Sequence, residues 1–182
     1  MLRVKKSKIF IVLLAVGIIV FGTIQLGIFK VNNAREEKYT KNQSDASTHD
    51  ITAIEDYRTS YMGDATNVTK LFSVLPLNDL PKTFEINSDT RSLTVNYSDS
   101  IGVVGEERIK KNMVYNSIAA MSAIDNLSEI TYNFSDNSYF FDRGKIKRIL
   151  GNPLSELLDK EIWDNQVQSK LNSNDFIRQF FD

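Results

Sequence analysis

The stretch Glu106–Leu127, EERIKKNMVYNSIAAMSAIDNL, carries the longest helical pattern of the folded part of the chain and decides its fold. Glu106 and Glu107 open it, where negative charge stabilises the first turn of a helix. Ala119 and Ala120 offer a small face for close approach to a sheet. The apolar residues keep helical spacing and are Ile109, Met113, Ala120, Met121, Ile124 and Leu127. We therefore expect a long helix that packs through one face on a sheet.

Two pairs of alternating runs flank this helix. Before it, Thr83–Asn87 and Ser92–Tyr97 alternate apolar and polar residues, with turn-forming residues between them. After it, Ile130–Phe134 alternates in the same way, Ser135–Ser138 forms a turn, and Tyr139–Phe141 returns. Each pair predicts a β-hairpin, and two hairpins joined by one long helix predict a sheet with helices on one face.

Shorter helical patterns complete the folded part. Ala65–Leu75 has one apolar face, and Asp64 or Thr66 can cap its start. The other short patterns are Lys145–Leu150, Glu161–Leu171 and Asp175–Phe181. The predicted order is α-ββ-α-ββ-α-α, which is typical of an α+β two-layer domain with a mainly antiparallel sheet, here over residues 55–182.

The N-terminal run Ile9–Phe29, IFIVLLAVGIIVFGTIQLGIF, is 21 residues long and carries no charge. A helix of that length spans about 30 Å, the thickness of the hydrocarbon core of a bilayer. A cleaved secretory signal has a shorter apolar run followed by small residues, whereas Gly22 and Gly27 are flanked by large residues. We expect an uncleaved transmembrane signal anchor over residues 9–29, with secretion after signal cleavage as the alternative.

Charge predicts the orientation of this anchor. Residues 1–8 hold four Lys/Arg and no acid, which keeps this tail in the cytoplasm and places the chain after Lys30 outside. The expected protein is therefore a single-pass protein of the cell membrane. Without those four residues, the 22 Lys/Arg fall to 18 against 23 Asp/Glu, so the exported part is acidic. An acidic domain is not expected to bind nucleic acid.

Residues 30–54 are polar and nearly lack large apolar side chains. The run Asn42–Asp50 in particular cannot bury enough surface to offset the entropy of ordering it. We expect a flexible linker with a short helical stem at Asn33–Lys41. The single histidine of the chain, His49, falls in this linker and is not expected to form a metal site or a catalytic group.

The usual motifs of catalysis and of cofactor binding do not occur in the sequence. The chain has no cysteine, so thiol chemistry and disulfides are excluded. Asp136 suits a hairpin turn better than a calcium loop. Glu106, Glu107 and Asp125 suit helix ends better than an acid/base pair. We expect no cofactor, no metal and no enzymatic activity, with an envelope hydrolase as the least favoured function.

Aromatic residues are the candidates for partner binding, because aromatic side chains dominate recognition surfaces. Phe140 and Phe141 are consecutive in a predicted strand, so their side chains point to opposite faces. One of them faces the core, and the other either meets a C-terminal helix or is exposed for a partner. The residues predicted to contact a partner are Tyr57, Tyr61, Phe140 and Trp163.

Several short motifs are similar to those of the domain-of-unknown-function family 4825. They are Tyr61-x-Gly63-Asp64, the helix Val68–Leu75 before Pro76, Thr83-Phe84, Leu93-x-Val95-Asn96-Tyr97, Ala123–Leu127 before Ile130-Thr-Tyr132, and Arg143–Gly151. The resemblance covers roughly Ile54–Leu171. It implies an extracytoplasmic α+β domain of membrane-anchored proteins in Gram-positive bacteria, with no catalytic residues assigned. Members occur beside signalling and membrane-peptidase modules, which implies a sensory role.

The expected function is therefore binding. A domain anchored by residues 9–29 would contact a membrane protein partner, a peptide or an envelope ligand in a sensory or accessory role. The alternative is a structural or assembly partner of a membrane complex.

Overall fold

The computed structural model describes residues 2–151 and 153–182, with side chains at 14, 16, 17, 20–151 and 153–182. The chain divides into two compact units, Met1–Lys41 and Asn42–Asp182. Helix α1, Leu2–Gln43, makes up the first unit, so the helical stem predicted at Asn33–Lys41 is part of a much longer helix.

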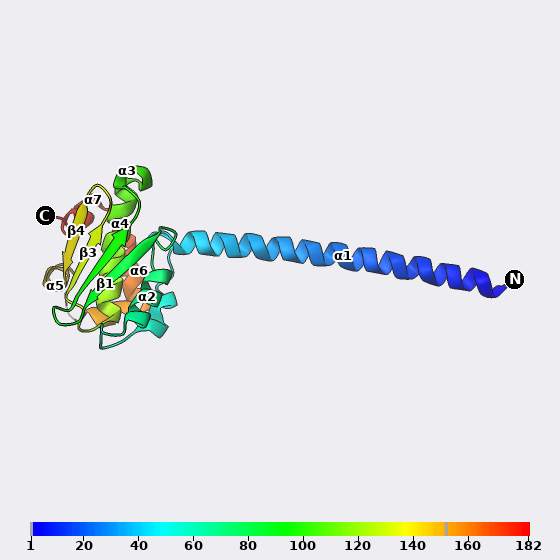
Figure 1. Ribbon diagram of the computed structural model, residues 1–182, viewed down its shortest axis with the longest axis horizontal. Helices are drawn as coiled ribbons and strands as arrows, with labels where there is room; N and C mark the ends of the chain where they lie inside the picture. The colour runs from blue at the N-terminus through cyan, green and yellow to red at the C-terminus, as the bar shows by residue number, and fades with distance from the viewer. Residues whose placement is uncertain (1, 152) are drawn as a thin grey trace. The chain divides into compact units, whose positions relative to one another are not determined.

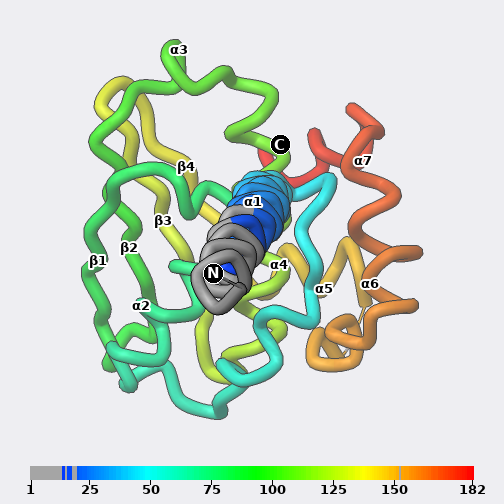
Figure 2. Tube along the Cα trace, turned by 90° about the vertical axis from the view of Figure 1, so that its right-hand side faces the viewer, coloured from blue at the N-terminus to red at the C-terminus, as the bar shows by residue number. Residues whose placement is uncertain are grey.

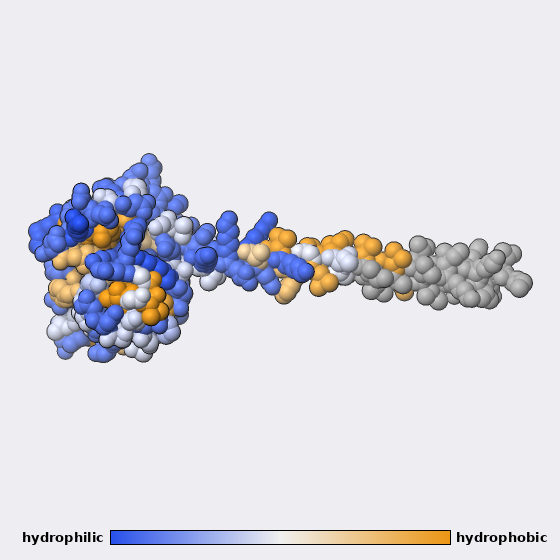
Figure 3. All heavy atoms as spheres, turned by 90° about the horizontal axis from the view of Figure 1, so that it is seen from above, coloured by the Kyte–Doolittle hydropathy of each residue, from blue (hydrophilic) through white to orange (hydrophobic). Residues whose placement is uncertain are grey.

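Large apolar side chains are exposed along the described part of α1, as the orange atoms on it show (Figure 3). They are Leu14, Val16, Val20, Phe21, Ile24, Leu26, Ile28, Phe29 and Val31. Within the described residues, no helix combines the length and the apolar character needed to cross a membrane. The predicted anchor Ile9–Phe29 lies in part outside the residues whose side chains are described, and it stays a prediction.

A four-stranded sheet organises the second unit (Figure 1). Its strands are β1 (Lys82–Asn87), β2 (Ser92–Tyr97), β3 (Glu129–Asn133) and β4 (Ser138–Asp142), in the spatial order β1-β2-β3-β4. β1 pairs with β2 and β3 pairs with β4 as the two predicted antiparallel hairpins. The central pair, β2 with β3, is parallel. The sheet is therefore mixed, and the prediction of a mainly antiparallel sheet is wrong.

Helix α4, Glu106–Ala123, explains the parallel pair. It joins the end of β2 to the start of β3, together with the short helix α3, Ile101–Val104. Parallel neighbours need a crossover connection of a dozen or more residues, and α4 supplies one. α4 is also the centre of the core, because every residue from Asn112 to Ala123 is buried.

The two faces of the sheet differ in character. The face toward α4 carries apolar side chains, which are Phe84, Ile86, Leu93, Val95, Tyr97, Ile130, Tyr132, Tyr139 and Phe141. The opposite face is polar and includes a hydrogen-bonded row in which Asn96 donates to Glu85 (2.8 Å) and Asn133 donates to Asn96 (2.7 Å). Figure 2 shows the strands on one side of the unit and α6 and α7 on the other.

The remaining elements are short. They are η1 (Ile51–Tyr57), α2 (Ala65–Val74), α5 (Arg143–Leu150), η2 (Leu154–Leu158), α6 (Lys160–Gln166), η3 (Gln168–Asn172) and α7 (Asn174–Arg178). Asp64 caps α2 by accepting from the amide of Asn67, as predicted. The single helix predicted over Glu161–Leu171 is divided at Val167 into α6 and η3.

The folded unit begins at Asn42, so the prediction of a flexible linker up to residue 54 is wrong for its second half. Ala46 and His49 are buried in the core. The Ala46 amide donates to the Asn112 side chain (2.7 Å), and the Gln168 side chain donates to the Ala46 and His49 carbonyls (3.0 Å each). Polar side chains of α4 and η3 therefore hold this segment in place without large apolar groups.

Candidate binding surface

The four aromatic residues predicted to contact a partner differ in their exposure to solvent. Trp163 is completely buried, with its ring edge-on to that of Tyr115 (4.8 Å between centroids), so its prediction as an exposed binding residue is wrong. Tyr57 is half-buried against the core. Tyr61 and Phe140 are exposed, by 68% and 56%. Only these last two can meet a partner without rearrangement.

Phe140 lies in β4 beside the buried Phe141, on the opposite face of the sheet. The ring of Phe141 packs against Tyr132 and against Phe181 near the C-terminus. Phe140 stands opposite Thr131 of β3, on the polar face. A single exposed apolar residue needs no functional explanation by itself, so the case for a contact surface depends on what lies beside Phe140.

A groove of about 450 Å³ runs beside Phe140. It is lined by Ser138, Tyr139, Phe140, Asp142, Lys145, Arg148, Phe180 and Phe181. Tyr139 points to the core face of the sheet and Phe140 to the polar face. Since the lining includes both faces of β4, the groove follows the outer edge of that strand, with α5 and the C-terminal residues as its other wall.

The walls of the groove carry more positive than negative charge. Lys145 donates to the carbonyl of Phe180 (3.2 Å), which ties α5 to the C-terminal wall. The Asp142 carboxylate is occupied in capping α5, where it accepts from the Lys145 amide (2.7 Å). Within the described part of the chain, neither Lys145 nor Arg148 forms an ion pair. Arg148 is therefore available to a ligand, and the Lys145 ammonium keeps two donors besides the one bound to Phe180.

Arg143 fixes the position of the β4–α5 junction. Its guanidinium donates to the carbonyl of Met121 in the last turn of α4 and to those of Ile124 (2.6 Å) and Leu127 (2.7 Å) just after the helix. A helix C-terminus presents unpaired carbonyls and partial negative charge, so a cation there is doubly favourable. The groove is thus built on a rigid junction between α4, β4 and α5.

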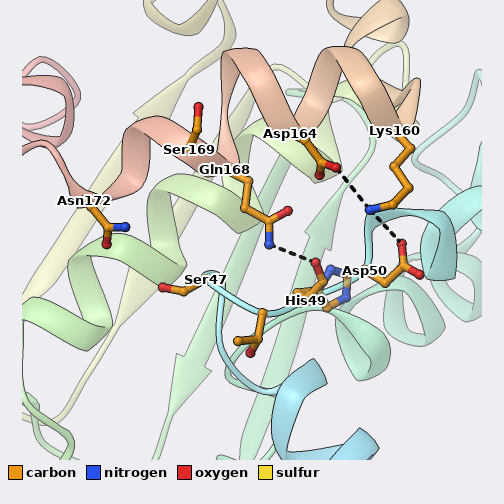
Figure 4. Close-up of a pocket in the computed structure, with 9 residues that line it drawn as sticks. Ser47, His49, Asp50, Lys160, Asp164, Gln168, Ser169 and Asn172 are labelled. Carbon is orange, nitrogen blue, oxygen red and sulfur yellow. Dashed lines mark hydrogen bonds and ion pairs between the residues drawn. The ribbon is translucent and has the colours of Figure 1, made fainter.

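A second hollow, of about 490 Å³, lies over the start of the folded unit (Figure 4). It is lined by Ser47, Thr48, His49, Asp50, Lys160, Asp164, Gln168, Ser169 and Asn172. Lys160 lies between Asp164 (3.3 Å) and Asp50 (3.7 Å), and Gln168 reaches the His49 carbonyl. These polar groups largely satisfy one another, so the hollow offers few groups to a ligand.

The His49 imidazole is buried beneath this hollow. Its Nε2 donates to the carbonyl of Val74 (3.0 Å), which leaves Nδ1 to accept from the hydroxyl of Tyr115 (2.7 Å). Burial lowers the pKa of His49 to about 4, against opposing effects of Val74 and Asp50. The ring is therefore neutral at physiological pH and acts as a structural tie.

The described residues hold no group of three or more His, Cys, Asp or Glu placed to bind a metal ion. Asp125 accepts from Ser60 (2.9 Å), and Asp136 accepts from the amide of Ile101 (2.9 Å). Both carboxylates thus have structural partners in loops.

The profile of one family, described as a domain of unknown function (DUF4825), matches residues 54–147. This match covers more than half of the chain. The chain belongs to this family. Two of the family-like motifs meet in the fold, because the Met62 amide donates to the Asn126 side chain (2.8 Å). No curated protein and no solved structure matches the chain.

Sequence reasoning found one residue of the groove, Phe140, and missed the rest. Lys145 and Arg148 are visible in the sequence as a basic cluster in α5, RGKIKRIL, which contains no acid. The sequence pattern predicts Phe180 and Phe181 to be part of a terminal helix. Their approach to β4 depends on the return of the chain through α6 and α7, which no local pattern encodes.

Proposed function

We propose that this protein is a membrane-anchored, extracytoplasmic binding protein with a sensory or accessory role. The folded unit contacts a protein or peptide partner, and α1 holds it at the cell membrane. The observation that carries the binding role is the groove along β4, which combines an exposed Phe140 with two cations that lack ion-pair partners among the described residues.

The proposal of membrane attachment is supported by the exposed apolar side chains of α1 between Leu14 and Val31. A helix that is apolar on all sides is stable only where lipid or protein covers it. The uncharged run Ile9–Phe29 and the basic residues before it fit the same role.

Crosslinking in intact membranes tests this proposal. The tagged full-length protein is crosslinked, recovered and compared with a chain that lacks Ile9–Phe29. We expect the full-length protein in the membrane fraction with a specific crosslinked partner, and loss of both for the shortened chain. A full-length protein found in the soluble fraction would overturn the anchoring role. A membrane-bound protein without any specific crosslinked partner would overturn the binding role.

A further inference from the structure

The outer edge of β4 has backbone groups that no described strand pairs with. A hydrogen-bonded residue pair lies at each end of the β3–β4 ladder. The Phe134 amide donates to the Asn137 carbonyl (2.8 Å) at one end, and the Arg143 amide donates to the Ser128 carbonyl (2.9 Å) at the other. Bonded and non-bonded pairs alternate in an antiparallel ladder with continuous register. The N–H and C=O of Phe140 therefore point away from β3, into the space beside the sheet.

This edge is recessed, not flat. The groove follows β4 over Ser138–Asp142, about 17 Å for a strand of that length, between the strand and the wall made by α5 and Phe180–Phe181. Tyr139 and Phe181 meet edge to face on the core side (5.6 Å between centroids) and close the groove there. An extended chain that lies along β4 would place its side chains alternately on the two faces of the sheet.

Charge selects among extended chains. Helix α5 contains Arg143, Lys145, Lys147 and Arg148 and no acid, and Lys145 and Arg148 line the groove. The one carboxylate in the lining, that of Asp142, is held by the start of α5. An incoming carboxylate therefore meets a fixed excess of positive charge, and an incoming lysine meets repulsion.

We infer that an extended, acidic segment of a partner protein binds in this groove and pairs with β4 as a fifth strand. The Phe140 amide donates to a carbonyl of the segment, and the Phe140 carbonyl accepts from one of its amides. Acidic side chains of the segment reach Arg148 and Lys145, and apolar ones contact Phe140. This inference rests on the proposed binding role and names the chemistry of the partner.

A second copy of this chain fits the groove less well. A two-fold contact through β4 uses the same surface from both copies, so Arg148 and Lys145 of each copy would enter one basic interface. Among the described residues, β4 is the strand at this edge of the sheet, and the one acid of that strand, Asp142, already caps α5. A partner with free carboxylates avoids both problems.

The test uses the full-length chain in detergent micelles and a labelled hexapeptide of alternating valine and glutamate with blocked ends. The matched probe alternates valine and lysine. Binding is followed by fluorescence anisotropy, and amide hydrogen exchange is measured at Phe140. We expect binding of the acidic probe only, with exchange at Phe140 slowed about tenfold or more when the site is filled.

Two variants and a control sharpen this test. Phe140→Pro removes the outward N–H, which the fold does not use, and should abolish binding. Arg148→Glu keeps the strand intact and should weaken binding of the acidic probe about tenfold or more. Val103→Ala trims an apolar side chain that is 80% exposed and does not line the groove, and should leave binding unchanged. If Phe140→Pro does not fold, Arg148→Glu and the comparison of the acidic with the basic peptide still test the inference.

Three results would overturn the inference. The basic probe could bind as well as the acidic one, or the acidic probe could bind without slowing exchange at Phe140. Alternatively, exchange at Phe140 could slow with protein concentration alone, which would assign the edge to a second copy. A crosslinked membrane partner that persists while both probes fail would retain the proposed function and refute the strand pairing.

Discussion

The Nδ1 atom of His49 lies 2.7 Å from the hydroxyl of Tyr115, so a polar residue just after α1 is hydrogen-bonded to the centre of the core. His49 is 1% exposed, and its other nitrogen is bound to the Val74 carbonyl. The imidazole therefore connects three segments that are distant in the sequence. When the imidazole is protonated, Nδ1 can no longer accept the hydrogen bond from Tyr115, so the fold is sensitive to acid.

We predict that stability falls as the pH drops from 6.5 to about 4. The unfolded chain binds a proton at His49 near pH 6.5, whereas burial lowers the pKa in the folded state to about 4. The unfolded state thus holds more protons within this window, and stability is lost there as pH decreases, by about 3 kcal/mol for His49 alone. Urea unfolding at pH 7, 5.5 and 4 measures the loss. His49→Gln should be less stable at pH 7 but should show a smaller dependence on pH.

Arg143 is predicted to be the most important cation for stability. Arg143→Ala leaves the carbonyls of Met121, Ile124 and Leu127 without their donor, and should lower the free energy of unfolding by about 3 kcal/mol. Arg148→Ala, on the exposed side of the same helix, should change it by less than about 0.5 kcal/mol. Equal effects of the two substitutions in thermal unfolding would contradict the role given to Arg143.

Trp163 and Tyr61 should differ in the same kind of experiment. Trp163→Ala opens a cavity beside Tyr115 and should cost about 3–5 kcal/mol of stability. Tyr61→Ala removes an exposed ring and should cost less than about 0.5 kcal/mol. A mild effect of Trp163→Ala on stability would argue that its ring is accessible after all.

Gly105 and Gly102 form a matched pair at the start of α4. Gly105 has φ +101°, which L-residues rarely adopt, so Gly105→Ala should lower stability by about 2 kcal/mol. Gly102 lies within α3 with no atom within 4 Å of an added Cβ, and Gly102→Ala should be neutral or slightly stabilising. Similar losses for both would contradict the role given to the backbone conformation of Gly105, because neither position has an atom within 4 Å of an added Cβ.

The strands were predictable because alternation is a local pattern. Leu93, Val95 and Tyr97 alternate in β2, and Ile130 and Tyr132 alternate in β3, so both hairpins are confirmed. The parallel contact between them is a property of the connection. Within each hairpin the two strands are antiparallel. The crossover through α4 places β2 and β3, one from each hairpin, side by side and parallel.

The polar composition of Asn42–Asp50 predicts a flexible linker, which is wrong because residues far away in the sequence form hydrogen bonds with this segment. The backbone of Ala46 is hydrogen-bonded to Asn112 and Gln168, and the His49 ring to Tyr115. Each pair is more than 60 residues apart in the sequence. Exposure of Phe140 followed from its neighbour Phe141, since one of two consecutive strand residues must leave the core. The other walls of the groove depend on tertiary structure alone.

We propose that the β4 edge at Phe140 contacts a partner of the full-length protein. Photocrosslinking tests this contact most directly, with a benzophenone amino acid placed at position 140 in the full-length chain and, as the control, at Val103, which is 80% exposed and does not line the groove. We predict a discrete crosslinked species from position 140 that disappears with Arg148→Glu, and none from position 103. No adduct at position 140, or the same adduct from both positions, would contradict this contact.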